Sequence, residues 1–214
     1  IVFSLVYLVL YPGLGNFKGT LGWTSHNQYD GEIADSDAKY GPIFAAFSAK
    51  SIPDLAKDPA AIKAGESLFS SYCSQCHGSD AKGTTGYPNL SDNDWLYGGE
   101  PAQIKQSILM GRNGVMPALG LSAENVENVA AASAEAGKAQ FQIMCVACHG
   151  ADAKGNYLLG APNLTDTTWL HGSTAGAIKK TIAEGRISKM PAHQEFLGED
   201  KAHVLAGYIY SLSN

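Results

Sequence analysis

The sequence predicts an all-α protein with two small tandem domains, on the evidence of its periodicity, its length and an internal repeat. Apolar residues recur at helical spacing, and no stretch alternates for long between apolar and polar residues. A length of 214 residues suits one large domain or two small ones. The segment that begins at Cys73 recurs 72 residues later at Cys145, and the one that begins at Pro88 recurs 74 residues later at Pro162. A tandem duplication therefore organises the chain.

The repeat defines the expected domains. Its register is broken by one two-residue insertion between Gly155 and Pro162, where we expect a surface loop. We expect a first domain at residues 59–132 and a second at 133–214. An apolar segment at residues 1–11 and a connector at residues 12–58 precede them.

Composition and charge exclude some classes of protein. Apolar residues make up 45% of the chain, which is enough for a core, but domains of under about 100 residues often need a staple such as a cofactor or metal. The formal net charge is −5 and the chain has no basic run, so a nucleic-acid partner is not expected.

The apolar segment 1–11 is interpreted as the C-terminal part of a transmembrane helix that contacts the lipid bilayer. As a helix it would be about 16 Å long, roughly half of the hydrocarbon thickness of a bilayer. Tyr7 and Tyr11 suit the membrane interface. The alternative is a short buried helix or strand of a soluble domain.

The connector 12–58 is predicted to be partly helical. Ser25 can cap a helix that carries Tyr29 and Ile33 and ends at Gly41-Pro42. An apolar patch follows at Ile43, Phe44 and Phe47. We expect this connector to pack on partner subunits.

Each repeat is expected to begin and end with a helix. Asp58 and Pro59 suit the N-cap and first turn of the first one. The closing helices are expected from Ser122 onward and at residues 200–212, the second with an apolar face formed by Ala202, Leu205, Ile209 and Leu212. We expect Gly137 and Phe141 to cross Gly207 and Tyr208 within the second domain. The first domain has Ala131-Ala132 at the corresponding place, so either a segment near Ala132-Ser133 is missing or the first domain is unusual.

The motif Cys-x-x-Cys-His occurs once in each repeat and is the signature of covalent c-type haem attachment. The residues concerned are Cys73, Cys76 and His77, and Cys145, Cys148 and His149. Two thiols at this spacing reach the two vinyl groups of one porphyrin, and the adjacent histidine ligates the iron. A disulfide gives no reason for the histidines, and the two pairs lie too far apart for a zinc ribbon. We therefore expect two covalently bound haem c groups.

The second axial ligand is predicted to be Met116 for the iron of His77 and Met190 for the iron of His149, because both lie in a repeated Gly-Arg-x-x-x-Met-Pro segment, 39 and 41 residues after the histidine. The unrepeated Met110 and Met144 are interpreted as core residues. His193 is an alternative ligand for the second domain, although a surface or local role is expected for it. With both axial positions filled, the irons transfer electrons and bind no substrate, so the chain has no active site of its own.

Further repeated residues are candidates for a supporting role around each haem. The carbonyl groups of Pro88 and Pro162 can accept a hydrogen bond from the Nδ1 of the ligating histidines. Trp95 and Trp169 either donate to a haem propionate or pack in the core. Arg112 and Arg186 either neutralise a propionate or are exposed loop charges. His26, His171 and His203 are expected to face solvent.

With these residues in place, each repeat resembles a class I cytochrome c domain. The N-terminal part is more specific, with Leu8-Val-Leu-Tyr-Pro-Gly-Leu-Gly-Asn-Phe-Lys-Gly, Gly22-Trp23 and Asp37-Ala-Lys-Tyr-Gly-Pro-Ile-Phe44. These segments resemble the stretch that follows the membrane helix in the dihaem subunit III of cbb3-type cytochrome c oxidases. The sequence departs from this family in its short membrane segment and in the early end of its first domain.

The resemblance implies an electron relay anchored in the bacterial inner membrane, with its haem domains in the periplasm. Electrons would come from a soluble c-type cytochrome or a cytochrome bc complex. They would pass to a monohaem cytochrome c subunit and then to the haem–copper catalytic subunit. The alternatives are a free soluble dihaem carrier and a dihaem peroxidase, which would need one iron with a removable ligand.

Overall fold

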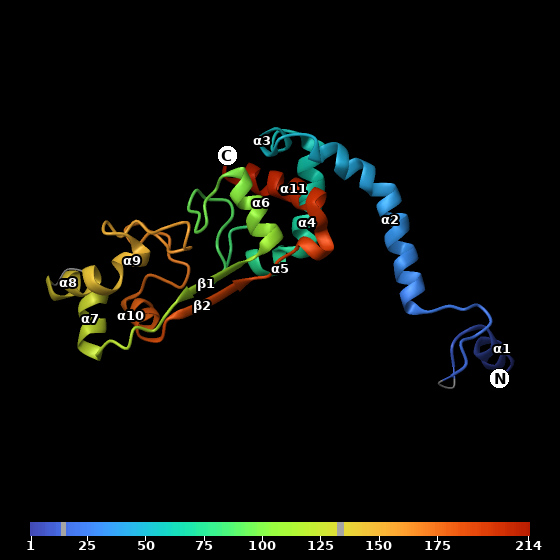
Figure 1. Ribbon diagram of the computed structural model, residues 1–214, viewed down its shortest axis with the longest axis horizontal. Coiled ribbons are helices and arrows are strands. Elements are labelled where there is room, and N and C mark those ends of the chain that lie inside the picture. The colour runs from blue at the N-terminus through green and yellow to red at the C-terminus, as the bar shows by residue number, and fades with distance from the viewer. Residues whose placement is uncertain (14–15, 132–134) are drawn as a thin grey trace. The chain divides into compact units, whose positions relative to one another are not determined.

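The computed structural model describes residues 1–13, 16–131 and 135–214. These divide into two compact units, Ile1–Ala46 and Phe47–Asn214. Both are mainly helical (Figure 1). The predicted break near Ala132-Ser133 lies outside the described residues.

The elements of the described residues are as follows. The helices are α1 (Val2–Leu10), α2 (Ser25–Ser48), α3 (Ile52–Leu55), α4 (Pro59–Tyr72), α5 (Ser74–His77), α6 (Pro101–Met110), α7 (Ala123–Ala131), α8 (Glu135–Met144), α9 (Val146–His149), α10 (Ala175–Glu184) and α11 (Gln194–Ser213), and the strands are β1 (Arg112–Met116) and β2 (Arg186–Met190).

The first unit begins with the apolar helix α1, none of whose residues is buried. The chain then returns along this helix, since the backbone N–H of Thr20 donates to the carbonyl of Val9 (2.9 Å). In the part of the chain that the structure describes, no helix is both long and apolar enough to cross a membrane. The interpretation of residues 1–11 as the end of a transmembrane helix is therefore not confirmed.

Helix α2 begins and ends differently from the prediction. Thr24 provides the capping hydroxyl in place of Ser25, because its Oγ1 accepts a hydrogen bond from the N–H of Asn27 (3.0 Å). The helix also continues through Pro42 to Ser48 instead of stopping at Gly41-Pro42. The predicted end was wrong because one proline removes a single backbone donor without preventing the following turns.

The second unit includes residues that the sequence placed in the connector. Ile52 and Leu55 of α3 are buried, and α3 packs on α11. An added Cβ on Gly207 of α11 would lie 2.8 Å from the Cβ of Leu55. This end of the predicted connector therefore belongs to the core of the second unit.

Two helix starts show why the helices begin where they do. The Asp58 carboxylate accepts hydrogen bonds from the N–H groups of Ala60 and Ala61, as the sequence predicts for the N-cap of α4. Thr174 caps α10 through a hydrogen bond from the N–H of Ala177 (3.2 Å). A capping side chain thus explains where each of these two helices begins.

The two repeats exchange their closing helices. Helix α11, at the end of the second repeat, packs on α4 and α6 of the first repeat, whereas α7 of the first repeat packs on α8 and α10 of the second. The ring of Phe69 in α4 lies 5.7 Å from that of Tyr208 in α11. The predicted crossing of Gly137 and Phe141 with Gly207 and Tyr208 was therefore wrong.

Charged side chains follow the same exchange. Lys105 of α6 forms an ion pair with Glu199 of α11 (2.8 Å). Lys179 of α10, its counterpart in the second repeat, forms an ion pair with Glu127 of α7. Exposed pairs of this kind contribute little stability, about 0–1 kcal/mol. They show that the contacts are reciprocal, as in an isologous dimer.

The exchange produces two groups of helices: a first group of α3, α4, α6 and α11, and a second group of α7, α8 and α10. A two-stranded antiparallel ribbon of β1 and β2 joins these two groups (Figure 1). Gly114 pairs with Ser188, its counterpart in the repeat, so the ribbon is centred on equivalent positions. The all-α prediction was wrong for these ten residues, because neither segment alternates clearly in polarity and each pairs with a strand from the other repeat. The helical prediction is right for most of the remaining chain.

Glycines at the ends of α6 and α10 allow the crossing. Gly111 and Gly185 have φ angles of 67° and 72°, a left-handed backbone that glycine adopts without strain. A Cβ on Gly111 would lie 2.7 Å from the nitrogen of Ala192, and one on Gly185 would lie 2.6 Å from that of Ala118. The backbone that follows β2 therefore packs against Gly111, and the backbone that follows β1 packs against Gly185.

Candidate functional site

Each Cys-x-x-Cys-His motif lies at the end of the first helix of its repeat. In the first repeat α4 ends at Tyr72, and the short helix α5 carries the motif to His77. In the second repeat α8 and α9 do the same and end at His149. The following glycine has a positive φ in both repeats, 79° at Gly78 and 78° at Gly150, and turns the chain back.

The two motif histidines are buried and held by a backbone carbonyl. The Nδ1 of His77 lies 2.9 Å from the carbonyl oxygen of Pro88, and the Nδ1 of His149 lies 3.1 Å from that of Pro162. An Nδ1–H that donates to this carbonyl fixes the tautomer and leaves Nε2 with its lone pair. These are the contacts that a haem-ligating histidine requires.

Burial favours the uncharged form of three motif side chains, Cys73, His77 and Cys145. Burial lowers the pKa of His77, against the opposing effect of the Pro88 carbonyl. Burial, with a smaller contribution from Cys76, raises the pKa of the Cys73 thiol to about 11. The pKa of Cys145 is also raised, mainly by burial. A neutral imidazole is the form that ligates iron.

The four cysteines are free thiols, and the second cysteine of each motif, Cys76 and Cys148, is exposed. Two free thiols and a buried histidine with its Nε2 available form a donor set that fits covalent haem. The residues present are therefore suited to one haem c in each repeat.

The candidate methionines lie at the ends of the ribbon, on the side of the other repeat. Met190 pairs with Arg112 in the ribbon, and Met116 pairs with Arg186. Beyond Met190 the backbone N–H of His193 donates to the carbonyl of Ile108 in α6 (3.0 Å). Met190 therefore belongs with the helices around His77, and the reciprocal contact of Gly185 places Met116 with the helices around His149.

His193 is buried, which rules out the surface role and leaves the local role that the sequence also allowed. Its Nδ1 has no hydrogen-bond partner among the described residues, and its ring lies 5.2 Å from that of Phe196. His193 also contributes to the lowered pKa of His77. As an alternative iron ligand it belongs with the first motif and not with the second, because the closing segment that carries it is exchanged.

The repeated arginines are half-buried and held in equivalent ways, so neither is an exposed loop charge. The Nε of Arg112 donates to the Oγ of Ser107, and the Nε of Arg186 donates to the Oγ1 of Thr181, both at 2.9 Å. The guanidinium of Arg112 also lies over the ring of Tyr97, 4.8 Å from its centroid. Both arginines are fixed beside the exchanged methionines.

The two tryptophans have different surroundings. The indole N–H of Trp169 donates to the carbonyl of Asp166 (3.1 Å), so in this structure its hydrogen bond goes to the backbone. Trp95 packs against the core of the first group of helices. Core packing is thus the role of Trp95 that the contacts support.

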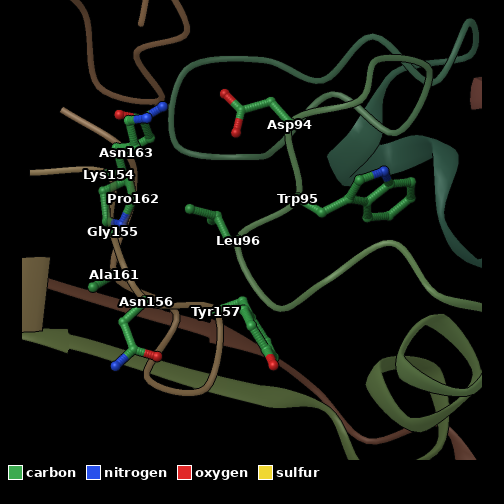
Figure 2. Close-up of a pocket in the computed structure, with 10 residues that line it drawn as sticks. All are labelled: Asp94, Trp95, Leu96, Lys154, Gly155, Asn156, Tyr157, Ala161, Pro162 and Asn163. Atoms are coloured by element: carbon green, nitrogen blue, oxygen red, sulfur yellow. The ribbon is translucent and has the colours of Figure 1, made fainter. Parts of the chain in front are cut away.

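A pocket of about 200 Å³ lies where the loops of the two repeats meet. Asp94, Trp95 and Leu96 of the first repeat line it together with the loop of the second repeat that contains Pro162, and Figure 2 shows Leu96 pointing toward that loop while the indole of Trp95 points away from it. The backbone N–H of Gly86 also donates to the carbonyl of Leu170 across this boundary (2.8 Å). The segments that hold the two motif histidines are therefore in direct contact.

Two methionines predicted to fill the core do not do so. Met110 and Met144 have exposed fractions of 64% and 37%. Neither position is a methionine in the other repeat. Periodicity alone does not distinguish a buried methionine from an exposed one at the end of a helix.

The chain matches the family model of cytochrome c oxidase, cbb3-type, subunit III twice, at residues 60–131 and 132–209. It is 44% identical to the cbb3-type cytochrome c oxidase subunit CcoP of Rubrivivax gelatinosus, over all of this chain and 75% of the relative. It is 36% identical to the subunit FixP of Bradyrhizobium sp. (strain ORS 278), over 99% of this chain and 84% of the relative. The subunit CcoP of Azospirillum brasilense is 32% identical over similar shares. The duplicated motifs and these matches over the whole chain lead to the same assignment: the chain belongs to the family of subunit III of cbb3-type cytochrome c oxidases.

Proposed function

We propose that this chain is the dihaem electron-transfer subunit of a membrane-bound cbb3-type oxidase. The observation that carries the proposal is the pair of equivalent sites, each with two free thiols and a buried histidine held by a proline carbonyl. Bound haem c supplies a one-electron iron couple at each site. Membership of the family supports the assignment to an oxidase complex.

Each site is assembled from both repeats. We assign His77 and Met190 as the axial ligands of the first iron, and His149 and Met116 as those of the second. The reciprocal contacts of Gly111 and Gly185 support this pairing. Thioether ligation raises the potential relative to ligation by two imidazoles. It also closes the position that oxygen or peroxide would need.

The residues around the ligands hold them in place. The carbonyls of Pro88 and Pro162 orient the two imidazoles. Arg112 and Arg186 supply fixed positive charge beside the distal ligands and are suited to offset the propionates. None of these groups takes part in bond making, so the chain carries electrons and does not itself reduce oxygen.

The partners are proposed from the family. The donor is a soluble c-type cytochrome or a cytochrome bc complex, and the acceptors are a monohaem cytochrome c subunit and the haem–copper catalytic subunit. We assign the haem domains to the periplasmic side of the bacterial inner membrane. Helix α1 contacts the bilayer, and α2 packs on the partner subunits through its exposed side chains Tyr29, Ile33, Tyr40 and Ile43.

Purification of the complex from membranes tests this proposal. Oxidase subunits should accompany the chain in constant proportion, and the pyridine haemochrome spectrum should give two c-type haems per chain. Cys73→Ser should lower that ratio to one, as should Cys145→Ser. A chain that leaves the membrane without partners would be a free carrier, and carbon monoxide binding to one haem of the wild-type protein would indicate a peroxidase.

A further inference from the structure

Two equivalent positions of the repeat carry different side chains at the contact between the repeats. Tyr97 and His171 each follow a Trp-Leu pair and lie 74 residues apart, so they correspond in the repeat. The ring of Tyr97 contacts Gly160 of the second repeat, and the ring of His171 contacts Gly86 of the first, where an added Cβ would lie 3.6 Å from its Cε1. The two rings occupy matched places.

Each ring is next to the arginine beside a proposed methionine ligand. Arg112 lies over the ring of Tyr97, and the positive charge of Arg186 acts on His171. Through the pairing of the ribbon, each arginine is opposite the methionine of its site. The two sites are therefore matched sets of four residues: His77, Met190, Arg112 and Tyr97, and His149, Met116, Arg186 and His171.

We infer that His171 makes the reduction potential of the iron held by His149 depend on pH, whereas Tyr97 gives the iron held by His77 no such dependence over the same range. This inference rests on the function proposed above. A phenol is not among the side chains that change charge near neutral pH. An imidazole is the side chain that changes charge between about pH 5 and pH 8.

The direction of the effect follows from charge. Burial, and then the charge of Arg186, lower the pKa of His171, so the ring is neutral at pH 7 and gains a proton on acidification. The added positive charge on His171 favours the reduced iron, which carries one positive charge fewer than the oxidised iron. The reduction potential of this iron therefore rises as the pH falls. By linkage, reduction of that iron raises the proton affinity of His171.

The electron and the proton balance over one cycle. One electron from the donor cytochrome reduces the iron, and the imidazole of His171 takes up a fraction of a proton from solvent. When the acceptor subunit removes the electron, the same fraction returns to solvent. No other oxidant or reductant is needed.

Other titratable groups face this contact and must be separated from His171. Arg186 lies in β2, Asp94 interacts with Asp92 and with Asp166 in the loop of His171, and Lys154 lines the same pocket as Asp94. Burial and the charge of Asp166 raise the pKa of Asp94, which makes this carboxyl the main competitor. Asp94→Asn is therefore the control.

Redox titration of the intact complex between about pH 5 and pH 8 tests the inference. The wild type should show one c-type couple whose potential rises on acidification and one that stays level. The slope should vanish in His171→Gln and His171→Tyr, persist in Asp94→Asn, and appear at the other couple in Tyr97→His. His171→Gln serves if the larger ring does not fit.

Two level couples in the wild type would overturn the inference, as would a slope that survives both His171 variants or disappears in Asp94→Asn. The proposed function fails on a different result. If the titration at a single pH does not resolve two reversible c-type couples, the dihaem assignment is wrong whatever the pH dependence.

Discussion

At the scale of single residues, the two sites are fixed by contacts that recur at equivalent positions. A proline carbonyl orients each motif histidine, and a hydroxyl holds each arginine. The motif residues were predictable because haem attachment demands their order and spacing. The sequence pairs each histidine with the methionine of its own repeat, whereas the exchanged helices place Met190 with the helices around His77, because long-range packing and not spacing decides the partner.

The exchanged ligation makes a prediction that contiguous domains do not. In a chain without the second haem (Cys145→Ser with Cys148→Ser), Met190→Leu should open the remaining iron to carbon monoxide, because we propose Met190 as the ligand of the iron held by His77. Met116→Leu in the same background should leave that iron closed. Difference spectra of the reduced protein with and without carbon monoxide measure this, and the reverse pattern would support ligation within each repeat.

A second residue-scale prediction concerns the start of α4. The bond from Lys50 (2.7 Å), and then the backbone N–H of Ala60, lower the pKa of Asp58. A carboxyl with a lowered pKa stabilises the fold above its ordinary pKa of 3.8, and this contribution is lost as the pH falls through the folded value.

Asp58→Asn tests this point, because asparagine still caps the helix but has no charge to lose. Between pH 7 and about pH 3 the wild type should lose more stability than the variant, as measured by the midpoint of chemical denaturation. Equal losses would mean that the ion pair with Lys50 contributes nothing.

At the scale of elements, α11 contributes much of the core of the first repeat. Its buried residues include Leu197, Ala202, Leu205, Ala206 and Ile209. The apolar face of this helix was predictable from its spacing, and so was the cap at Asp58. Its partner was not, because duplication gives Gly65 and Gly137 the same signal, and the choice between them depends on long-range packing.

The close approach of α11 to α4 predicts a selective effect of one methyl group. Gly65→Ala should destabilise the protein by about 1–3 kcal/mol, because the added Cβ would overlap the side chain of Tyr208 in the exchanged helix. Gly176→Ala is the matched control, since a Cβ on Gly176 of α10 meets nothing within 4 Å.

The control should be neutral or stabilise the protein by up to about 1 kcal/mol through helix propensity. Thermal unfolding of the two variants gives both values. Equal stability of the two variants would mean that α4 and α11 do not cross at Gly65.

At the scale of the whole molecule, the second unit is one assembly of two interdependent sites. The ribbon, the two exchanged helices and the contact of Gly86 with Leu170 connect the repeats. Removal of residues 194–214, which include all of α11, should therefore disrupt the site of His77 in the other repeat. The absorption spectrum of the truncated chain should show the first haem open to carbon monoxide, and an intact first site would refute the exchange of helices.

The central claim is that the chain relays electrons through two closed irons to oxygen chemistry carried out by its partners. The most direct measurement is the absorbance of the reduced c-type haems after mixing with oxygen, in the isolated chain and in the intact complex. The account predicts that the isolated chain stays reduced, while in the complex the same haems are oxidised as oxygen is consumed. Rapid oxidation of the isolated chain, or a complex that consumes oxygen while these haems stay reduced, would contradict it.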